Sequence, residues 1–399
     1  MCEWQECKLG DVVLIDTGFA FKSKYYSEEG NLRVVRGKNV TVGATRWGSN
    51  SQFWNHSTIG LEKYFLKEFD IVIGMDGSKI GENRSQIKKS NLPAILAQRV
   101  ARLRAKENAD QIFIWHLIFS DNFENYIKSI YTGTSIPHIS QSQIADFEMS
   151  LPPLPEQRAI ASVLSSLDDK IDLLHHQNKT LEAMAETLFR QWFVEEADEG
   201  WETARVGDFV RTNVASINKD NALKTIRYLD TGSLTEGKID GYQTFDIGDA
   251  PSRARRIVKT NDVLISTVRP NQKHYGILKN PAEDVIVSTG FCVITCDKIN
   301  PHFIYILLTT DEMTEYLHSI AEGSTSTYPS LKPSDIEGLE FQLPPQEKLD
   351  AFSEYADNAW SKIEYNHTHI ITLEKLRDTL LPKLMSGEVR IQFGQEATV

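Results

Sequence analysis

Apolar residues recur at alternating steps of four and three positions in two long stretches of the chain, residues 154–195 and 346–387. This alternation is typical of the seam of a coiled-coil helix, because a helix in a globular domain carries a broader apolar stripe. At a rise of 1.5 Å per residue, each stretch predicts a helical rod of roughly 50 Å. The first seam consists of Ile160, Leu164, Leu167, Ile171, Leu174, Asn178, Leu181, Ala185, Leu188 and Trp192, and the second of Phe352, Ala356, Ala359, Ile363, Asn366, Ile370, Leu373, Arg377, Leu380 and Leu384.

Each seam contains one asparagine, and the two asparagines indicate how the helices pair. An antiparallel pairing that sets Asn178 against Asn366 also sets the start of each seam against the end of the other, with Ile160 against Leu384. We therefore predict an antiparallel coiled coil whose register is fixed by Asn178 and Asn366, at some cost in stability. The alternative is a pair of unrelated amphipathic helices, each packed on its own core.

The segments that precede the two rods share landmarks, and a repeat of this length predicts two copies of one globular domain. Each copy has a tryptophan and a Gly-Asp pair near its start, a buried-strand signal after a charged turn, a capped aromatic-rich helix, and a final strand that ends at Leu-Pro-Pro. The helix is expected to end near Tyr131 in one copy and near Ile320 in the other. The matched segments are residues 9–11 with 206–208, 70–73 with 262–265, 98–103 with 290–294, 110–113 with 300–303, 133–135 with 323–325, and 151–153 with 343–345.

The predicted fold class is α+β. Two mixed α/β globular domains, residues 1–153 and 196–345, are separated by two long helices that form an antiparallel coiled coil. The whole is a tandem repeat with a pseudo-twofold axis, so that a single chain imitates a symmetric dimer. Residues 195–200 form an acidic hinge between the copies, and residues 388–399 form a C-terminal tail.

The formal net charge of −12 argues against a protein whose whole surface binds nucleic acid, but it averages over surfaces with different roles. Residues 79–106 carry eight lysines and arginines against Glu82 alone, and residues 253–279 carry seven against Asp262 alone. Each window is either a solvated surface or a local basic patch, and their recurrence in both copies favours the patch. Four cysteines in two distant pairs, no run of 18 apolar residues and no leader-like N-terminus predict a reduced, cytoplasmic protein outside the membrane.

Catalytic motifs are absent from the sequence. There is no phosphate-binding loop and no dinucleotide-binding glycine pattern, and the glycine-rich residues 74–81 fit neither spacing. Those residues predict either a loop that approaches a ligand closely or a simple tight turn. Asn300 precedes Pro301 and corresponds to Asp110 in the first copy, so it is expected to cap a helix rather than to catalyse. We predict neither a catalytic residue nor a metal site.

The sequence Leu-Pro-Pro-Leu-Pro-Glu-Gln-Arg-Ala-Ile at residues 151–160, followed by residues 167–172 and by Leu181-Glu182, resembles the central conserved region of type I restriction–modification specificity subunits. Residues 98–100 and 133–140 resemble strands and ends of the recognition domains of that family. The resemblance covers essentially the whole chain, because the tandem layout matches as well. The second copy departs from it at residues 343–349, where the full Pro-x-Glu-Gln form is missing.

This resemblance implies a non-catalytic subunit with two target recognition domains, each reading one half of a bipartite target in double-stranded DNA. The coiled coil would hold the halves apart, and a rod of roughly 50 Å spans on the order of 14 base pairs. Two methylating (M) subunits that use S-adenosylmethionine and two motor–nuclease (R) subunits that use ATP and Mg²⁺ would bind the chain, which needs no cofactor of its own. The rival class is a tandem coiled-coil scaffold that binds proteins without DNA specificity, and a third reading is an enzyme of unknown type. A steep salt dependence of DNA binding would separate a DNA reader from a scaffold.

The expected DNA contacts follow the matching buried strands of the two copies. In both places basic residues stand among small ones, so backbone can approach phosphate while long side chains reach the groove. The predicted contacts are Gly77, Ser78, Lys79, Arg84 and Arg99 in the first copy, and Ser266, Thr267, Arg269, Lys273 and Tyr275 in the second.

Overall fold

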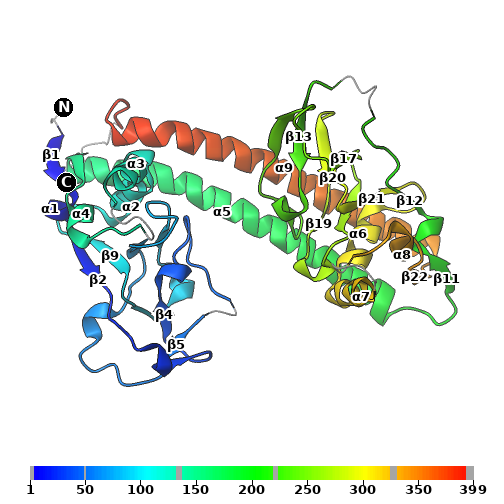
Figure 1. The fold of residues 1–399 in the computed structure, drawn as a ribbon, viewed down its shortest axis with the longest axis horizontal. Helices are drawn as coiled ribbons and strands as arrows, with labels where there is room; N and C mark the ends of the chain where they lie inside the picture. The colour runs from blue at the N-terminus through cyan, green and yellow to red at the C-terminus, as the bar shows by residue number, and fades with distance from the viewer. Residues whose placement is uncertain (1–3, 49–50, 132–136, 219–222, 324–329, 392–399) are drawn as a thin grey trace, which may run out of the picture. The chain divides into compact units, whose positions relative to one another are not determined.

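The computed structural model of the protein divides into two compact units, each of which contains one globular domain and part of both long helices (Figure 1). Unit 1 comprises residues 1–173 and 370–399, and unit 2 comprises residues 174–369. The residues that the structure describes are 4–48, 51–131, 137–218, 223–323 and 330–391. The matched segments at 133–135 and 323–325 therefore lie almost wholly outside the described residues.

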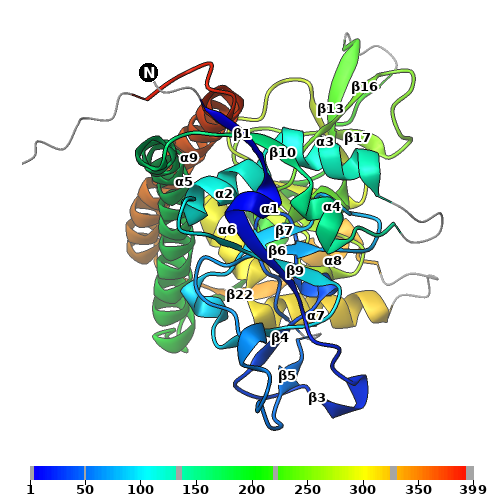
Figure 2. The same cartoon turned by 90° about the vertical axis from the view of Figure 1, so that its left-hand side faces the viewer.

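Unit 1 is built on two four-stranded sheets. One has the strand order β2-β9-β6-β7 and is antiparallel throughout, and the other has the order β3-β5-β4-β8 with β4 and β8 parallel. A separate two-stranded ribbon pairs β1 with β10 beside α1 and α4 (Figure 2). The strands are β1 (Gln5–Lys8), β2 (Val13–Thr17), β3 (Tyr26–Ser27), β4 (Arg33–Val35), β5 (Phe53–Trp54), β6 (Ile71–Gly74), β7 (Arg84–Gln86), β8 (Ala94–Leu96), β9 (Val100–Ala105) and β10 (Glu148–Leu151), and the helices are α1 (Leu9–Val12), α2 (Gln111–Phe119), α3 (Asp121–Ile130) and α4 (Gln141–Ala145).

Unit 2 repeats this plan. Its antiparallel sheet has the order β12-β21-β18-β19, its second sheet has the order β16-β13-β20-β17 with β13 and β20 parallel, and β11 pairs with β22. A small hairpin joins β14 to β15. The strands are β11 (Glu202–Arg205), β12 (Val210–Thr212), β13 (Thr225–Leu229), β14 (Leu234–Thr235), β15 (Lys238–Ile239), β16 (Gln243–Asp246), β17 (Ala254–Ile257), β18 (Val263–Ser266), β19 (Tyr275–Ile277), β20 (Val285–Ser288), β21 (Phe291–Cys296) and β22 (Glu340–Leu343), and the helices are α6 (Pro301–Thr309), α7 (Asp311–Glu322) and α8 (Pro333–Glu337).

The repeat predicted from landmarks is confirmed by hydrogen bonds that recur in both units. The turn before β6 is closed by Asp70, whose carboxylate accepts from the backbone N–H of Lys67 at 2.7 Å, and Asp262 accepts from Lys259 at 2.7 Å before β18. Gly207 corresponds to Gly10, and each is required by a close approach. A Cβ on Gly10 would lie 2.9 Å from the Cβ of Ala145, and one on Gly207 would lie 3.0 Å from the carbonyl oxygen of Glu337.

The aromatic-rich helix expected in each copy is in fact two helices, so the prediction of a single helix was wrong. Ser120 stands between α2 and α3, and its hydroxyl accepts from the backbone N–H of Phe123. Thr310 does the same for Met313 between α6 and α7. A side chain that caps a new helix competes with continuation of the old one, and this ends the first helix. The starts are as predicted, with Asp110 and Asn300 as N-caps.

The two long helices are α5 (Leu154–Arg190), which continues into a π-helical turn at Gln191–Glu195, and α9 (Gln346–Met385). In unit 2 the Nδ2 of Asn366 donates to the Oδ1 of Asn178 at 2.7 Å, and both residues are buried. In unit 1 the Nη1 of Arg377 donates to Asp168 at 3.1 Å. Residue numbers rise along one helix as they fall along the other in both units. The antiparallel pairing and the asparagine register are thus confirmed.

The end of the first seam differs from the prediction. Leu188 and Trp192 are only half-buried, and Phe189 and Phe193 take the buried positions instead. Their rings lie with centroids 5.9 and 5.3 Å from that of Phe352. Both rings also pack on Phe303, at 5.1 Å. The apolar stripe turns here because the last turns of α5 pack on the core of the globular domain as well as on α9.

Candidate nucleic-acid interface

In unit 1 the loop after β6 meets the segment that enters β9. The backbone N–H of Met75 donates to the carbonyl of Arg99 at 3.0 Å, and the Nη1 of Arg99 donates to the carboxylate of Asp76 at 3.0 Å. Gly77 lies at φ +108°, and its N–H donates to the carbonyl of Pro137 at 3.1 Å. The structure therefore brings Arg99 next to the loop that carries Gly77, Ser78 and Lys79, and the side chains of Ser78, Lys79 and Arg99 are exposed.

In unit 2 the loop after β18 is built in the same way. The backbone N–H of Thr267 donates to the carbonyl of Gly290 at 2.8 Å, and its hydroxyl donates to the same oxygen at 2.9 Å. Arg269 is exposed and precedes a single 3₁₀ turn, Pro270–Gln272. Thr267 and Arg269 thus occupy the part of unit 2 that corresponds to the loop of Gly77 and Lys79 in unit 1.

The prediction for Arg84 needs correction, because this arginine is buried at 2% exposure. Its Nη2 donates to the carboxylate of Glu124 at 2.5 Å, and its Nη1 donates to the carbonyl of Ile118 at 2.8 Å. Burial lowers the pKa of Arg84 from its ordinary value, and the charge of Glu124 opposes that shift. Arg84 joins β7 to the end of α2 and does not line a DNA surface.

Ser266 also needs correction. It is buried at 2% exposure, and its hydroxyl donates to the carbonyl of Val268 at 2.9 Å, which closes the turn after β18. The nitrogen of Lys273 lies 2.7 Å from Asp311 and 3.5 Å from Glu236. Tyr275 is half-buried, and burial raises the pKa of its hydroxyl to about 12. Lys273 and Tyr275 remain predicted contacts, but each already has a role in packing the loop.

Three of the predicted contacts have a strained backbone. Arg99, Arg269 and Lys273 have φ values of 64°, 49° and 56°. Side chains other than those of glycine, asparagine and aspartate rarely adopt this region, and residues held there cluster at functional sites. Among the described residues only Phe69 and Glu236 share this property outside glycine and asparagine. The strain supports the assignment of these two loops.

Part of the basic window 79–106 is structural. Arg102 forms an ion pair with Asp16 and donates to the carbonyl of Lys63 at 2.8 Å. Arg104 donates to the carboxylate of Asp70 at 2.7 Å from Nη2. With Arg84, three of the eight bases in this window therefore hold strands together. Charge counted along the sequence overstates the basic surface here.

A second basic surface, which was not predicted from the sequence, lies in unit 1 near β3 and β5. The Nζ of Lys24 lies 4.9 Å from the ring centroid of Tyr25, and the Tyr25 ring lies 5.2 Å from that of His56 and 6.5 Å from that of Trp54. Six bases stand against two acids in residues 18–47. Aromatic and basic side chains side by side suit contact with nucleic acid. The clustered signal Lys22-x-Lys24-Tyr25 could have identified it.

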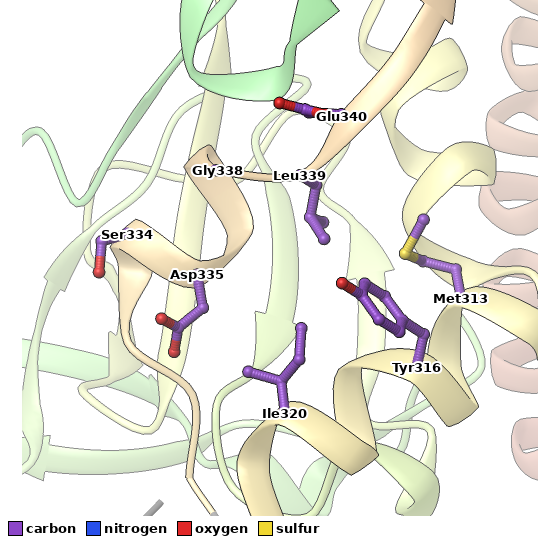
Figure 3. A pocket seen from close by; sticks show the side chains of 8 residues that line it. All are labelled: Met313, Tyr316, Ile320, Ser334, Asp335, Gly338, Leu339 and Glu340. Carbon is purple, nitrogen blue, oxygen red and sulfur yellow. The ribbon is translucent and has the colours of Figure 1, made fainter. Parts of the chain in front are cut away.

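A hollow of about 490 Å³ lies in unit 2 beside α7, α8 and β22, and Met313, Tyr316 and Ile320 project from one helix toward Leu339 (Figure 3). In unit 1 the corresponding place holds aromatic rings, where Phe123 and Tyr126 pack on Phe147 at centroid distances of 5.1 and 5.2 Å. Met313 and Leu339 stand where unit 1 has Phe123 and Phe147. The hollow therefore follows from smaller side chains, and we assign no ligand to it. Its lining is Met313, Tyr316, Ile320, Ser334, Asp335, Gly338, Leu339 and Glu340.

Within the described residues no three histidine, cysteine or acidic side chains are grouped so as to bind a metal ion. A search of the same residues finds no helix with the length and apolar character that a membrane span requires.

Among the carboxyl groups of the rod, we expect Glu182 of α5 to contribute most to the pH dependence of the free energy of unfolding. Burial, and secondarily the charge of Glu186, raise the pKa of Glu182 to about 7. A carboxyl whose folded pKa lies above its unfolded value stabilises the protein below the unfolded pKa, near 4.5, and this contribution is lost as the pH rises through about 7. Glu182→Gln should therefore raise the free energy of unfolding by about 1–3 kcal/mol at pH 8 and change it little near pH 4.5.

The measurement is urea unfolding of variant and wild type at each pH, because the difference cancels other titrating groups such as the buried His116 and His302. Glu186→Gln is the matched control, with a smaller expected gain. An equal effect of Glu182→Gln at both pH values would contradict the burial of the charged form.

The family model described as "Type I restriction modification DNA specificity domain" matches residues 1–183. The chain is 28% identical over 330 residues to the type I restriction enzyme MjaIX specificity subunit of Methanocaldococcus jannaschii, which covers 75% of this chain and 74% of the relative. It is 24% identical over 444 residues to the EcoBI specificity subunit of Escherichia coli, covering 98% and 88%. The fold is similar to the crystal structure of a type I restriction–modification S subunit from M. genitalium, with a TM-score of 0.59, 16% identity and 96% of each chain covered.

Proposed function

Since the chain belongs to the family of type I restriction–modification specificity subunits, we propose that it reads a bipartite target in double-stranded DNA, one half with each globular domain. It is a DNA sequence-recognition subunit and has no catalytic activity of its own. The observation that carries the bipartite reading is the repeat, because both units have the same antiparallel strand order and the same hydrogen-bonded turns before β6 and β18. Two copies of one reader on one chain suit a target in two parts.

The rod supports the stoichiometry of the proposed assembly. Leu173 and Met184 of α5 are each 49% exposed, and Tyr365 and Leu376 of α9 are 53% and 45% exposed. Counted from the Leu-Pro-Pro motif of each copy, Leu173 corresponds to Tyr365 and Met184 to Leu376. Exposed apolar residues that recur in this way suit a protein partner for each copy.

We propose that two methylating subunits bind the chain, one per copy, and that two motor–nuclease subunits join them. S-adenosylmethionine, ATP and Mg²⁺ would be bound by those partners, and the assembly would work in the cytoplasm on chromosomal DNA.

The test is adenine-methylation mapping of a genome that carries this chain with its methylating partner. Exchanging residues 1–150 for the same segment of a related chain should change one half of the methylated target and leave the spacing unchanged. A target altered in both halves would contradict independent reading, and a continuous target would contradict the bipartite one.

The predicted DNA contacts are tested by charge reversal. Lys79→Glu combined with Arg269→Glu should weaken binding to duplex DNA by at least about tenfold at low salt and reduce the salt slope by about 2, since each phosphate contact contributes about 0.9. The matched control is Lys170→Glu with Lys179→Glu, which makes the same charge change at exposed positions of α5. If both double variants weaken binding equally, the two loops are not the contact surface.

A further inference from the structure

In unit 1 a buried ion pair ties the start of α5 to the segment after α9. Glu156 is 1% exposed, and its carboxylate accepts from the Nε1 of Trp4 at 3.2 Å and from the Nη2 of Arg390 at 2.6 Å. The guanidinium of Arg390 lies 5.4 Å from the ring centroid of Trp4. Tryptophan, cation and carboxylate thus form one cluster, in which the helix start supplies the acid.

In unit 2 the same cluster occurs with its charges exchanged. Lys348 stands in α9 where Glu156 stands in α5, and its nitrogen lies 5.4 Å from the ring centroid of Trp201. The same nitrogen lies 3.6 Å from Glu196, which follows α5. Here the helix start supplies the base and the segment after the other helix supplies the acid. Side chains of Lys348 and Glu196 are 37% and 50% exposed, so this pair is weaker than the one in unit 1.

The buried asparagine layer also depends on which copies pair. Counted from the two Leu-Pro-Pro motifs, Asn178 corresponds to Ile370 and Asn366 corresponds to Leu174. If the first copy paired with a second first copy, Asn178 would face Leu174 in two layers, and each buried amide would lose its 2.7 Å hydrogen bond. Pairing of two second copies would set Asn366 against Ile370 with the same loss. Leaving a buried polar group without a partner is destabilising.

The ion pair of Asp168 with Arg377 also forms only when a first copy pairs with a second copy. Arg377 corresponds to Ala185 of the first copy, so a pair of first copies would leave Asp168 facing alanine. Glu156 would meet the acidic residues 195–199 instead of Arg390. A buried carboxylate that loses its partner and gains like charges is strongly unfavourable.

We propose that the two copies are built to recognise each other and to reject a second copy of themselves. The rod of a first copy pairs with the rod of a second copy, from the same chain or from another. Two first copies do not pair with each other, and neither do two second copies. Charge exchange at the helix start excludes pairs of first copies, and the asparagine layer excludes pairs of either kind.

Two substitutions in the second copy of the full chain each reproduce one contact that a pair of first copies would make. Asn366→Leu and Arg390→Asp each install the residue that the first copy has at the corresponding place, and each should lower the melting temperature by several degrees. Asn178→Ile combined with Asn366→Leu makes the layer apolar and should recover the loss, and Lys375→Asp, at an exposed position of α9, should have little effect. Melting temperatures of Asn366→Leu and Arg390→Asp within one degree of wild type would overturn the proposal.

Selectivity itself is measured after cutting the folded full chain at a protease site placed in residues 197–200. Light and isotopically heavy cut protein are mixed, and native mass spectrometry identifies the pairs that form. Pairs of a light first half with a heavy second half report exchange, and we expect no pair of two first or two second halves. Self-pairs at the frequency of random association would overturn the proposal. A variant with Glu156→Gln, Asn178→Leu and Asn366→Leu should form self-pairs and serves as the positive control.

Discussion

Inserting one alanine between His176 and Gln177 should abolish methylation of the target by the assembled enzyme. The insertion rotates every later residue of α5 by about 100° and shifts it by about 1.5 Å. In unit 2 the amide of Asn178 would then leave Asn366, and Ala185, Phe189 and the residues after them would turn away from α9. The apolar side chains of the seam would become exposed. The domain core that contains Phe189 would lose the side chains of these last turns of α5.

The measurement is methylation-site mapping together with thermal unfolding of the purified chain. An alanine inserted after Gly241 is the matched control, because a Cβ at Gly241 would meet no atom within 4 Å. Insertion of a whole heptad into both α5 and α9 restores the seam and should be tolerated, with a longer spacer in the target. A heptad insertion that left the spacer unchanged would show that the rods do not set the distance between half-sites.

Replacing Arg84 with methionine should reduce the free energy of unfolding by about 1–3 kcal/mol, which is the usual cost of leaving a buried hydrogen-bonding group without its partner. Glu124 would lose the guanidinium that lies 2.5 Å away, and the carbonyl of Ile118 would lose its donor at the end of α2. Glu124 keeps Lys128, whose nitrogen lies 2.8 Å from its other carboxylate oxygen, so the loss is that of the buried hydrogen bonds of Arg84 and not of all charge compensation at Glu124.

Urea unfolding measures this effect, and Arg99→Met is the matched control in the same domain. Arg99 also pairs with a carboxylate, that of Asp76 at 3.0 Å, but its side chain is 67% exposed. Removal of such a pair should cost at most about 1 kcal/mol. Arg99→Met should instead weaken DNA binding. If Arg84→Met instead kept wild-type stability and lost DNA binding, Arg84 would be a DNA contact after all.

The rods and the repeat could be predicted because they rest on local, periodic signals. A seam of alternating fours and threes specifies a coiled coil, and the position of Asn178 and Asn366 within it specifies the register. The starts of α2 and α6 followed from Asp110 and from Asn300 before Pro301, since caps act on neighbouring backbone.

The candidate site could be predicted only in part, because a sequence shows where arginines stand and not which way they point. Arg84 and Arg99 lie in one basic window, yet one is buried against Glu124 and the other is exposed beside Gly77. Whether such an arginine is buried or exposed depends on partners that are distant in the sequence. The backbone strain at Arg269 and Lys273 was likewise invisible, because nothing in the residue type predicts a positive φ.

The tandem repeat on two paired helices is already encoded in local signals, since period, caps and Leu-Pro-Pro exits act over short distances along the chain. Which charges serve stability and which remain for a partner depends on contacts that form when the chain folds. Glu156 is the clearest example, because it belongs to the motif that carries the family resemblance, whereas its structural role depends on Trp4 and Arg390, which lie 152 and 234 residues away. Contacts between residues so far apart in the sequence depend on the tertiary fold, and no local sequence pattern predicts them.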